Sequence, residues 1–209
     1  MRGETFVRRV VGRRLRAAAL IVGESFAFGR DRHGNMATLR SLAPELGMRV
    51  MAVRDVRSGG VPISSSRIRR LIAGGRLADA RRLLGRPPAL YGTVVRGAGR
   101  GRRLGFPTAN VRLTASTLPP CGVYTVLLET AAGRYRGVMN LGVRPTFGPG
   151  PLVCEVHLLD VTSRLLGRAV TVWLCARLRS ERRFPSPQAL VRQVRRDVRR
   201  VRRILARPR

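Results

Sequence analysis

The sequence predicts an α+β protein made of two unlike parts, a partial α/β segment followed by an antiparallel β-barrel that ends in a helix. In the first part, apolar residues at helical spacing alternate with short continuous apolar runs, as in helices and buried parallel strands. In the second part, short runs with period-two alternation are separated by loops rich in Gly, Pro and Thr. The last stretch returns to helical spacing.

The first part, residues 1–84, follows the order helix, strand, helix, strand, helix, helix. Helical spacing predicts helices over residues 4–16, 36–46, 67–73 and 77–84. Continuous apolar runs predict buried strands over residues 18–22 and 49–53. Two strands are too few for a full sheet, so we expect a piece of a doubly wound, Rossmann-like fold.

The second part, residues 86–209, is expected to form the barrel and its closing helix. Its predicted strands are residues 90–95, 122–129, 135–141, 152–159 and 169–178. The closing helix starts after Ser186 as N-cap, with Pro187 in its first turn and an apolar stripe that ends at Leu205. Its other face is rich in arginine, which indicates either a solvated face or a contact with nucleic acid.

The charge of the chain is extreme, with 42 basic against 11 acidic residues and a formal net charge of +31. Every basic residue is an arginine. This composition fits either arginine usage spread over solvated faces or non-specific binding of polyanions. The sequence indicates no specific protein partner and no membrane partner.

Three cysteines in apolar segments predict reduced thiols in a cytoplasmic protein. The sequence has no signal peptide and no apolar run long enough to cross a membrane. With only two histidines and no Cys-x-x-Cys pair, a zinc site is not expected.

The most informative stretch is residues 97–110, which combine four glycines, three arginines and a Thr-x-Asn pair. Glycines let the backbone approach a ligand closely, and arginines complement phosphate. Thr108 and Asn110 offer neutral oxygens, which a hard cation such as Mg²⁺ accepts alongside phosphate oxygens. The spacing is not that of a P-loop, and a flexible solvated turn is the alternative.

With its Pro-Thr-Ala-Asn end, this run resembles the signature of the riboflavin kinase family, which phosphorylates riboflavin to FMN with ATP and Mg²⁺. Four further blocks are similar to that family: residues 121–126, 139–147, 154–160 and 178–184. The resemblance implies a riboflavin kinase domain over residues 86–209. It also implies Mg²⁺ as cofactor, ATP as co-substrate, riboflavin as substrate and FMN as product.

Among the five carboxylates after Arg86, Glu155 stands out because it lies inside an apolar strand, on the same face as His157. A surface-facing glutamate is the alternative interpretation from periodicity alone. The resemblance makes Glu155 the catalytic base and lets Thr108 and Asn110 hold Mg²⁺ and the ATP phosphates. His157 is interpreted as a structural neighbour of the base, with a second base as the alternative.

The resemblance also assigns a nucleotide-binding loop and three residues that shape the site. The loop residues are Gly97, Gly99, Arg100, Gly101, Arg102, Gly105, Phe106, Pro107 and Thr108. The site-shaping residues are Asn140, Thr146 and Phe147. The flavin ring is expected between the barrel mouth and the terminal helix. Ala98 and Arg103 depart from the family pattern, which has Asp and a small hydroxyl residue there.

Residues 22–29 and 63–69 resemble the FMN adenylyltransferase domain of the nucleotidyltransferase superfamily, which is commonly fused before riboflavin kinase in bacteria. The chain is expected to start about halfway through that domain, without its His-x-Gly-His motif. Only His33 and His157 occur, so FMN adenylyltransferase activity is expected to be absent. One interpretation of the second of these segments is a vestigial phosphate site formed by Ser64, Ser65, Ser66 and Arg69. The alternative is a helix cap beside a solvated arginine.

The sequence therefore predicts an enzyme of flavin biosynthesis, an ATP-dependent riboflavin kinase. Two alternatives stay open. One is a full bifunctional riboflavin kinase/FAD synthetase whose true start lies upstream, and the other is a non-catalytic remnant that binds flavin or polyanions.

Overall fold

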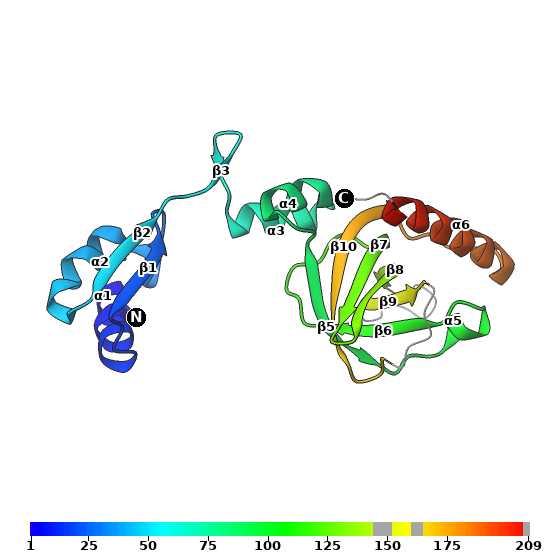
Figure 1. Cartoon of the computed structure of the whole chain (residues 1–209), viewed down its shortest axis with the longest axis horizontal. Helices are drawn as coiled ribbons and strands as arrows, with labels where there is room; N and C mark the ends of the chain where they lie inside the picture. Colours follow the sequence, from blue (N-terminus) through cyan, green and yellow to red (C-terminus); the bar gives the residue numbers. More distant parts are fainter. Residues whose placement is uncertain (144–151, 160–164, 207–209) are drawn as a thin grey trace. The chain divides into compact units, whose positions relative to one another are not determined.

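The structure is a computed structural model that describes residues 1–143, 152–159 and 165–206 (Figure 1). The chain divides into two units, Met1–Ile63 and Ser64–Arg209. The predicted boundary lies between residues 84 and 86, whereas this division groups the two helices before the barrel with the barrel. The mixed α and β content of the prediction is confirmed.

The first unit is built on two parallel strands, β1 (Ala19–Gly23) and β2 (Arg49–Val53), which pair from Ala19 opposite Arg49 to Gly23 opposite Val53. Helical segments pack on this pair and form a small core with it. They are α1 (Gly3–Phe6), the π-helical η1 (Val7–Arg14), the 3₁₀ turns η2 (Arg30–Arg32) and η3 (Pro44–Leu46), and α2 (Met36–Leu42). The buried residues include Val7, Val11, Phe28, Leu39, Leu42 and Met48.

Helix α2 starts and ends for local reasons. Asn35 accepts a hydrogen bond from the backbone N–H of Thr38 at 3.1 Å, and its own N–H donates to the Thr38 hydroxyl at 3.4 Å. The α-helix ends earlier than the predicted residue 46, because Pro44 lacks the N–H that would continue the hydrogen-bond ladder. A short hairpin of β3 (Arg57–Ser58) and β4 (Val61–Pro62) follows β2 and was not predicted.

The second unit is a closed barrel with the strand order β10-β5-β6-β9-β8-β7, and every neighbouring pair is antiparallel. The strands are β5 (Ala89–Val95), β6 (Thr108–Leu113), β7 (Gly122–Thr130), β8 (Gly133–Val143), β9 (Leu152–Leu158) and β10 (Ala169–Arg179). The predicted antiparallel barrel is confirmed. Strand β6 was not predicted: its residues 108–110 form the end of the glycine-rich run, and residues 111–113 were assigned to no element.

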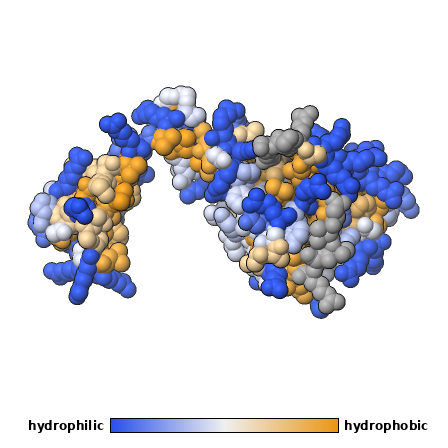
Figure 2. All heavy atoms as spheres, viewed as in Figure 1, coloured by the Kyte–Doolittle hydropathy of each residue, from blue (hydrophilic) through white to orange (hydrophobic). Residues whose placement is uncertain are grey.

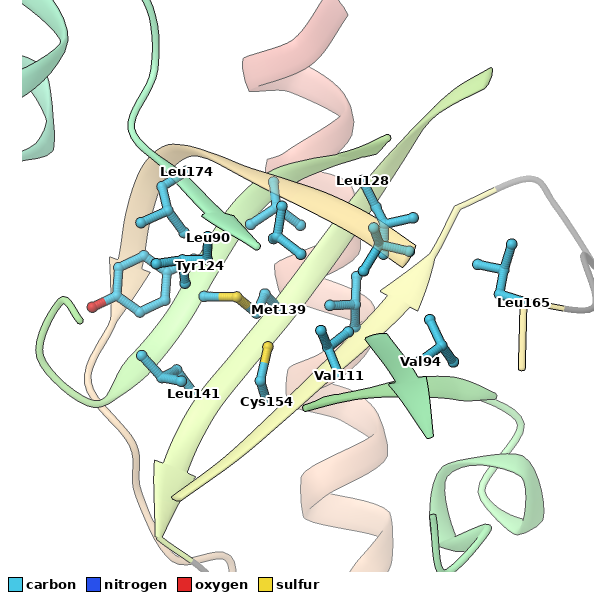
Figure 3. Close-up of a cluster of buried hydrophobic side chains, with 14 of the residues drawn as sticks. Leu90, Val94, Val111, Tyr124, Leu128, Met139, Leu141, Cys154, Leu165 and Leu174 are labelled. Atoms are coloured by element: carbon cyan, nitrogen blue, oxygen red, sulfur yellow. The ribbon is translucent and has the colours of Figure 1, made fainter. Parts of the chain in front are cut away.

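The barrel interior is filled by side chains from alternate positions of its strands (Figure 3). Tyr124, Met139 and Leu174 point into this core and are at most 1% exposed. Helices α3 (Ser65–Ala73) and α4 (Leu77–Leu84) precede the barrel, and Leu77 packs into the same core. The hydroxyl of Ser64 caps α3 by accepting a hydrogen bond from the Arg67 N–H at 3.2 Å.

Helix α6 (Pro187–Ala206) packs on the outer face of the barrel. Its Val201 is fully buried in a cluster with Val123 of β7 and Val138 of β8. Ser186 caps the helix as predicted, since its hydroxyl accepts a hydrogen bond from the Ala189 N–H at 3.2 Å. Among the described helices, none is both long enough and apolar enough to span a membrane.

A buried ion pair joins α6 to the barrel. Arg179 at the end of β10 donates to Asp197 of α6, with Nε 3.0 Å and Nη2 2.8 Å from Oδ2. Gln193, one turn earlier in the helix, donates from Nε2 to the other carboxylate oxygen at 2.8 Å. Asp197 is therefore buried and engaged by two donor side chains, although its neighbours in the sequence are mostly arginines.

On the barrel surface, the only tryptophan of the chain is held by polar partners. The indole N–H of Trp173 donates to Glu129 Oε2 at 2.7 Å, and Arg134 donates to the same oxygen from Nη2 at 2.7 Å. The guanidinium of Arg86 lies 5.3 Å from the centre of the indole ring. Trp173 and Arg134 lower the pKa of Glu129 below its ordinary value, because both donate to the charged carboxylate.

We expect Trp173 fluorescence to report the protonation of Glu129. The lowered pKa means that the Glu129 interactions stabilise the fold fully above about pH 4.3, the ordinary value. This contribution is lost as the pH falls through the lower, folded-state pKa. An acid titration of the tryptophan emission should show this step, and Glu129→Gln should remove it. A midpoint at or above the ordinary glutamate value would contradict the assignment.

Candidate active site

A cavity of about 560 Å³ lies between the outer face of the barrel, the segment before β6 and helix α6. Its walls are mainly apolar, with aliphatic and aromatic side chains from β7, β8, α6 and two connecting segments. They are Leu104, Phe106, Val123, Val138, Phe184, Leu190, Val191 and Val194. The cavity is large enough for a flat, mostly apolar ligand. It lies against the outer face of the barrel, whereas the prediction expected the barrel mouth.

A second, smaller cavity of about 170 Å³ adjoins the first. The residues that line only this cavity are mostly small, and its polar side chains are Asn110 and several that it shares with the first cavity; the unshared residues are Ala98, Gly99, Asn110, Gly142 and Val153. Six residues line both cavities: Arg100, Thr108, Asn140, Val143, Glu155 and Glu181. An apolar pocket and a polar pocket therefore meet at a region with two carboxylates.

Strand register brings the predicted site residues together. Glu155 of β9 lies opposite Asn110 of β6 on one side and opposite Asn140 of β8 on the other. His157 lies opposite Thr108 and on the same face as Glu155. Because the alternate residues Cys154 and Val156 are buried in the barrel core, this polar row points outward into the pockets.

Burial also makes the core neighbour of Glu155 inert. It raises the pKa of the Cys154 thiol to about 12, with a smaller contribution from the charge of Glu155. A thiol with so high a pKa is not a nucleophile near neutral pH. Of the strand residues 154–157, only those on the outer face are available for chemistry.

The glycine-rich run folds back onto the strand that carries Thr108 and Asn110. Helix α5 (Arg100–Arg103) is one short turn between Gly99 and Gly105, both with positive φ, 68° and 82°. A Cβ on Gly97 would overlap the side-chain amide of Asn110, and a Cβ on Gly101 would lie 3.2 Å from the Thr108 hydroxyl. Glycine at these two positions thus lets the loop backbone pass close to the side chains of Asn110 and Thr108.

His157 holds the residue that precedes Thr108. Its Nδ1 donates a hydrogen bond to the carbonyl oxygen of Pro107 at 2.9 Å, so Nδ1 carries the proton. The Phe106 ring lies edge-on to the imidazole, with 5.4 Å between the ring centres. These contacts fit the interpretation of His157 as a structural neighbour of the base.

Glu181 and Phe184 are site residues that the sequence reasoning missed. Asn140 donates from Nδ2 to Glu181 Oε1 at 3.3 Å, and a Cβ on Gly142 would overlap the Glu181 carboxylate. The Phe184 ring packs against the guanidinium groups of Arg179 and Arg182, at 5.7 and 4.8 Å from its centre. Both residues lie between β10 and α6, where no periodic pattern marks them.

The predicted residues divide into three groups. Gly99, Arg100, Gly101, Phe106, Thr108, Asn110, Asn140 and Glu155 line one or both cavities. Gly97, Arg102, Gly105, Pro107, Ser64, Ser65, Ser66 and Arg69 are not among these lining residues. Thr146 and Phe147 lie outside the described residues. Within residues 1–143, 152–159 and 165–206, no group of three His, Cys, Asp or Glu side chains could hold a metal ion.

The closed barrel, its covering helix and the two joined cavities define a ligand-binding β-barrel with one apolar and one polar pocket. A family model described as riboflavin kinase matches residues 84–205, more than half of the chain, and one described as FAD synthetase matches residues 1–67. The chain belongs to the riboflavin kinase family.

Curated relatives carry the name bifunctional riboflavin kinase/FMN adenylyltransferase. The protein of Escherichia coli K12 is 40% identical over 195 residues, covering 93% of this chain and 62% of the relative. That of Haemophilus influenzae is 36% identical, covering 93% of this chain and 64% of the relative. The chain thus spans less than two thirds of the length of these relatives.

Among solved structures, a protein of Streptococcus pneumoniae described as a macrolide-efflux protein is similar over nearly the whole chain. The TM-score is 0.78 at 31% identity, and the match covers 97% of this chain and 65% of that one.

Proposed function

We propose that this chain transfers the γ-phosphoryl group of ATP to the 5′-hydroxyl of riboflavin and releases FMN and ADP. The observation that carries the proposal is the meeting of the apolar and the polar cavity at Glu155. A flavin ring fits the apolar cavity and nucleotide phosphates fit the glycine-lined one, so the reacting hydroxyl and phosphorus would meet beside this carboxylate.

Glu155 acts as the general base in this proposal. Its carboxylate takes the proton of the 5′-hydroxyl while the new O–P bond forms and the bond between the γ-phosphorus and the bridging oxygen breaks, with ADP as leaving group. Asn110 and Asn140 flank Glu155 across both neighbouring strands, so the position of the base is fixed by backbone pairing. Glu181 orients Asn140 through their hydrogen bond.

Thr108 and Asn110 are the residues that would hold Mg²⁺. They are alternate residues on the outer face of β6, and the absence of a Cβ at Gly97 and Gly101 leaves the loop backbone directly beside their side chains. Mg²⁺ held there would supply positive charge to offset that of the transferring phosphates. The loop from Gly97 to Phe106 would surround the phosphates with backbone N–H groups, and Arg100 and Arg102 would add charge.

The test is a direct assay of the purified chain. Riboflavin, ATP and Mg²⁺ are incubated with it, and the flavins are separated by chromatography. We expect FMN to form, and EDTA to abolish its formation. The absence of FMN with folded protein would overturn the proposal.

The three free cysteines fit a reducing compartment, and we place the enzyme in the cytoplasm.

The same assay tests the second activity of the relatives. We expect this chain to form no FAD from FMN and ATP, because His33 and His157 are its only histidines and neither lies in a His-x-Gly-His motif. FAD formation would instead support the full bifunctional enzyme. Without FMN or FAD, a non-catalytic protein that binds flavin or polyanions becomes the better interpretation.

Substitution of His157 should act through the loop that it holds. His157→Ala removes the hydrogen bond to the Pro107 carbonyl, and we expect kcat/KM for ATP to fall roughly 3- to 10-fold, as for the loss of one intramolecular hydrogen bond. His157→Asn keeps an N–H donor at the position of Nδ1 and should recover most of the loss. If the Asn variant is no better than the Ala variant, the hydrogen bond is not what matters.

A further inference from the structure

The exposed face of α6 carries a regular row of cations, which we call the arginine stripe: Arg192, Arg195, Arg196, Arg199 and Arg203. All five are exposed, and their spacing places them on one side of the helix within an arc of about 100°. The stripe is about 16 Å long, from the helical rise of 1.5 Å per residue. In Figure 2, hydrophilic side chains gather over the region of α6.

The charge of this stripe is not neutralised within the described part of the chain. The one carboxylate of α6, Asp197, is buried and engaged by Arg179 and Gln193. Arg196 donates to Gln193 Oε1 at 2.8 and 3.1 Å, a neutral partner that leaves its charge in place. No carboxylate among the described residues pairs with a stripe arginine.

The other side chains of α6 restrict the kinds of polyanion that the arginine stripe could bind. Its apolar side is used by packing on the barrel, with Val201 fully buried and Val198 beside it. The apolar residues of its first half, Leu190, Val191 and Val194, face the apolar cavity, so the apolar side of the helix is turned toward the barrel unit and not toward a membrane. It also contains no aromatic residue on which the bases of a single strand could stack.

A straight and rigid polyanion matches a straight row of arginines on a firmly packed helix. Each strand of duplex DNA carries one phosphate per about 3.4 Å of its axis, so the length of the stripe matches roughly five phosphates of one strand. The major groove of B-DNA, about 12 Å wide, admits a helix, whereas that of A-form RNA is too narrow. We propose that the arginine stripe binds the phosphate backbone of duplex DNA without base specificity, independently of the kinase site.

The experiment measures binding of a labelled duplex of about 20 bp by fluorescence anisotropy, between about 50 and 200 mM salt. With four to five phosphate contacts, log K should fall against log[salt] with a slope of about −4. The stripe variant changes Arg192, Arg195, Arg199 and Arg203 to Gln, a good helix former. We expect its slope to lose about 3 to 4 and its affinity to fall at least roughly tenfold.

A matched control removes the same charge elsewhere, at four exposed arginines off α6: Arg13, Arg40, Arg70 and Arg112, each changed to Gln. It should stay within about threefold of the parent chain, and thermal melts by circular dichroism check that both variants fold. Equal losses in both variants would mean that overall charge, not α6, does the binding, and would overturn the proposal. So would tighter binding to duplex RNA, single-stranded DNA or phosphatidylserine vesicles than to duplex DNA, or no binding of the parent chain.

Discussion

Glu155→Gln should reduce kcat for FMN formation by about 10² to 10⁴, the usual contribution of a general base. Glutamine keeps the shape of the side chain and its place between Asn110 and Asn140, but it cannot accept the proton of the 5′-hydroxyl. The loss should therefore appear in kcat, with little change in KM for either substrate. Steady-state kinetics with both substrates varied will measure this split.

Glu181 offers the matched control, because its carboxylate lines the same two cavities. Glu181→Gln can still accept the hydrogen bond from Asn140, so we expect kcat to change by less than about tenfold. If Glu181→Gln costs more in kcat than Glu155→Gln, the base is Glu181. Near-normal turnover in both variants would remove proton transfer to a carboxylate from the mechanism.

Asp197→Ala should lower the free energy of unfolding of the barrel unit by about 3 to 5 kcal/mol, as when one partner of a buried ion pair is removed. The substitution leaves the Arg179 guanidinium, whose side chain is 20% exposed, without its counter-charge between the barrel and α6. Urea unfolding followed by Trp173 fluorescence will measure the loss, since this single tryptophan lies on β10 of the same unit.

Two controls define the origin of this loss. Asp79→Ala also removes an aspartate with two arginine partners, but on the exposed side of α4, and should cost at most about 1 kcal/mol. The double variant Arg179→Met/Asp197→Leu replaces the pair with apolar side chains and should recover most of the stability. A loss below about 1 kcal/mol in Asp197→Ala would show that water reaches the pair and screens it.

The barrel could be predicted because several of its strands alternate between buried and more exposed residues, as around Val156 of β9 and Val172 of β10. Strand β6 could not. Val111 is its only fully buried residue, and its pairing is supplied by β5 and β9, which lie on either side of it in space. The boundary near residue 84 separated α3 and α4 from the barrel, because a sequence pattern does not reveal that Leu77 packs into the barrel core.

A residue of the candidate site could be predicted where the sequence around it is itself unusual, as for the carboxylate of Glu155 inside an apolar strand. Glu181 and Asp197 do not stand out in the same way, because each has arginines close by in the sequence and lies outside an apolar strand. In the structure, their partners come from distant positions, Asn140 of β8 for Glu181 and Arg179 of β10 for Asp197. A carboxylate that is solvated among neighbouring arginines and a carboxylate that is buried against one distant arginine look the same in the sequence. The sequence alone therefore cannot distinguish the two cases.

The row formed by Asn110, Glu155 and Asn140 across three adjacent strands ties activity to the correctness of folding. If β9 slipped by one residue, Glu155 would turn into the barrel interior and Cys154 would face the substrates. A slipped molecule would then be fully inactive, not merely slower. The specific activity of a refolded sample would therefore measure the fraction of molecules in which β9 has the native register.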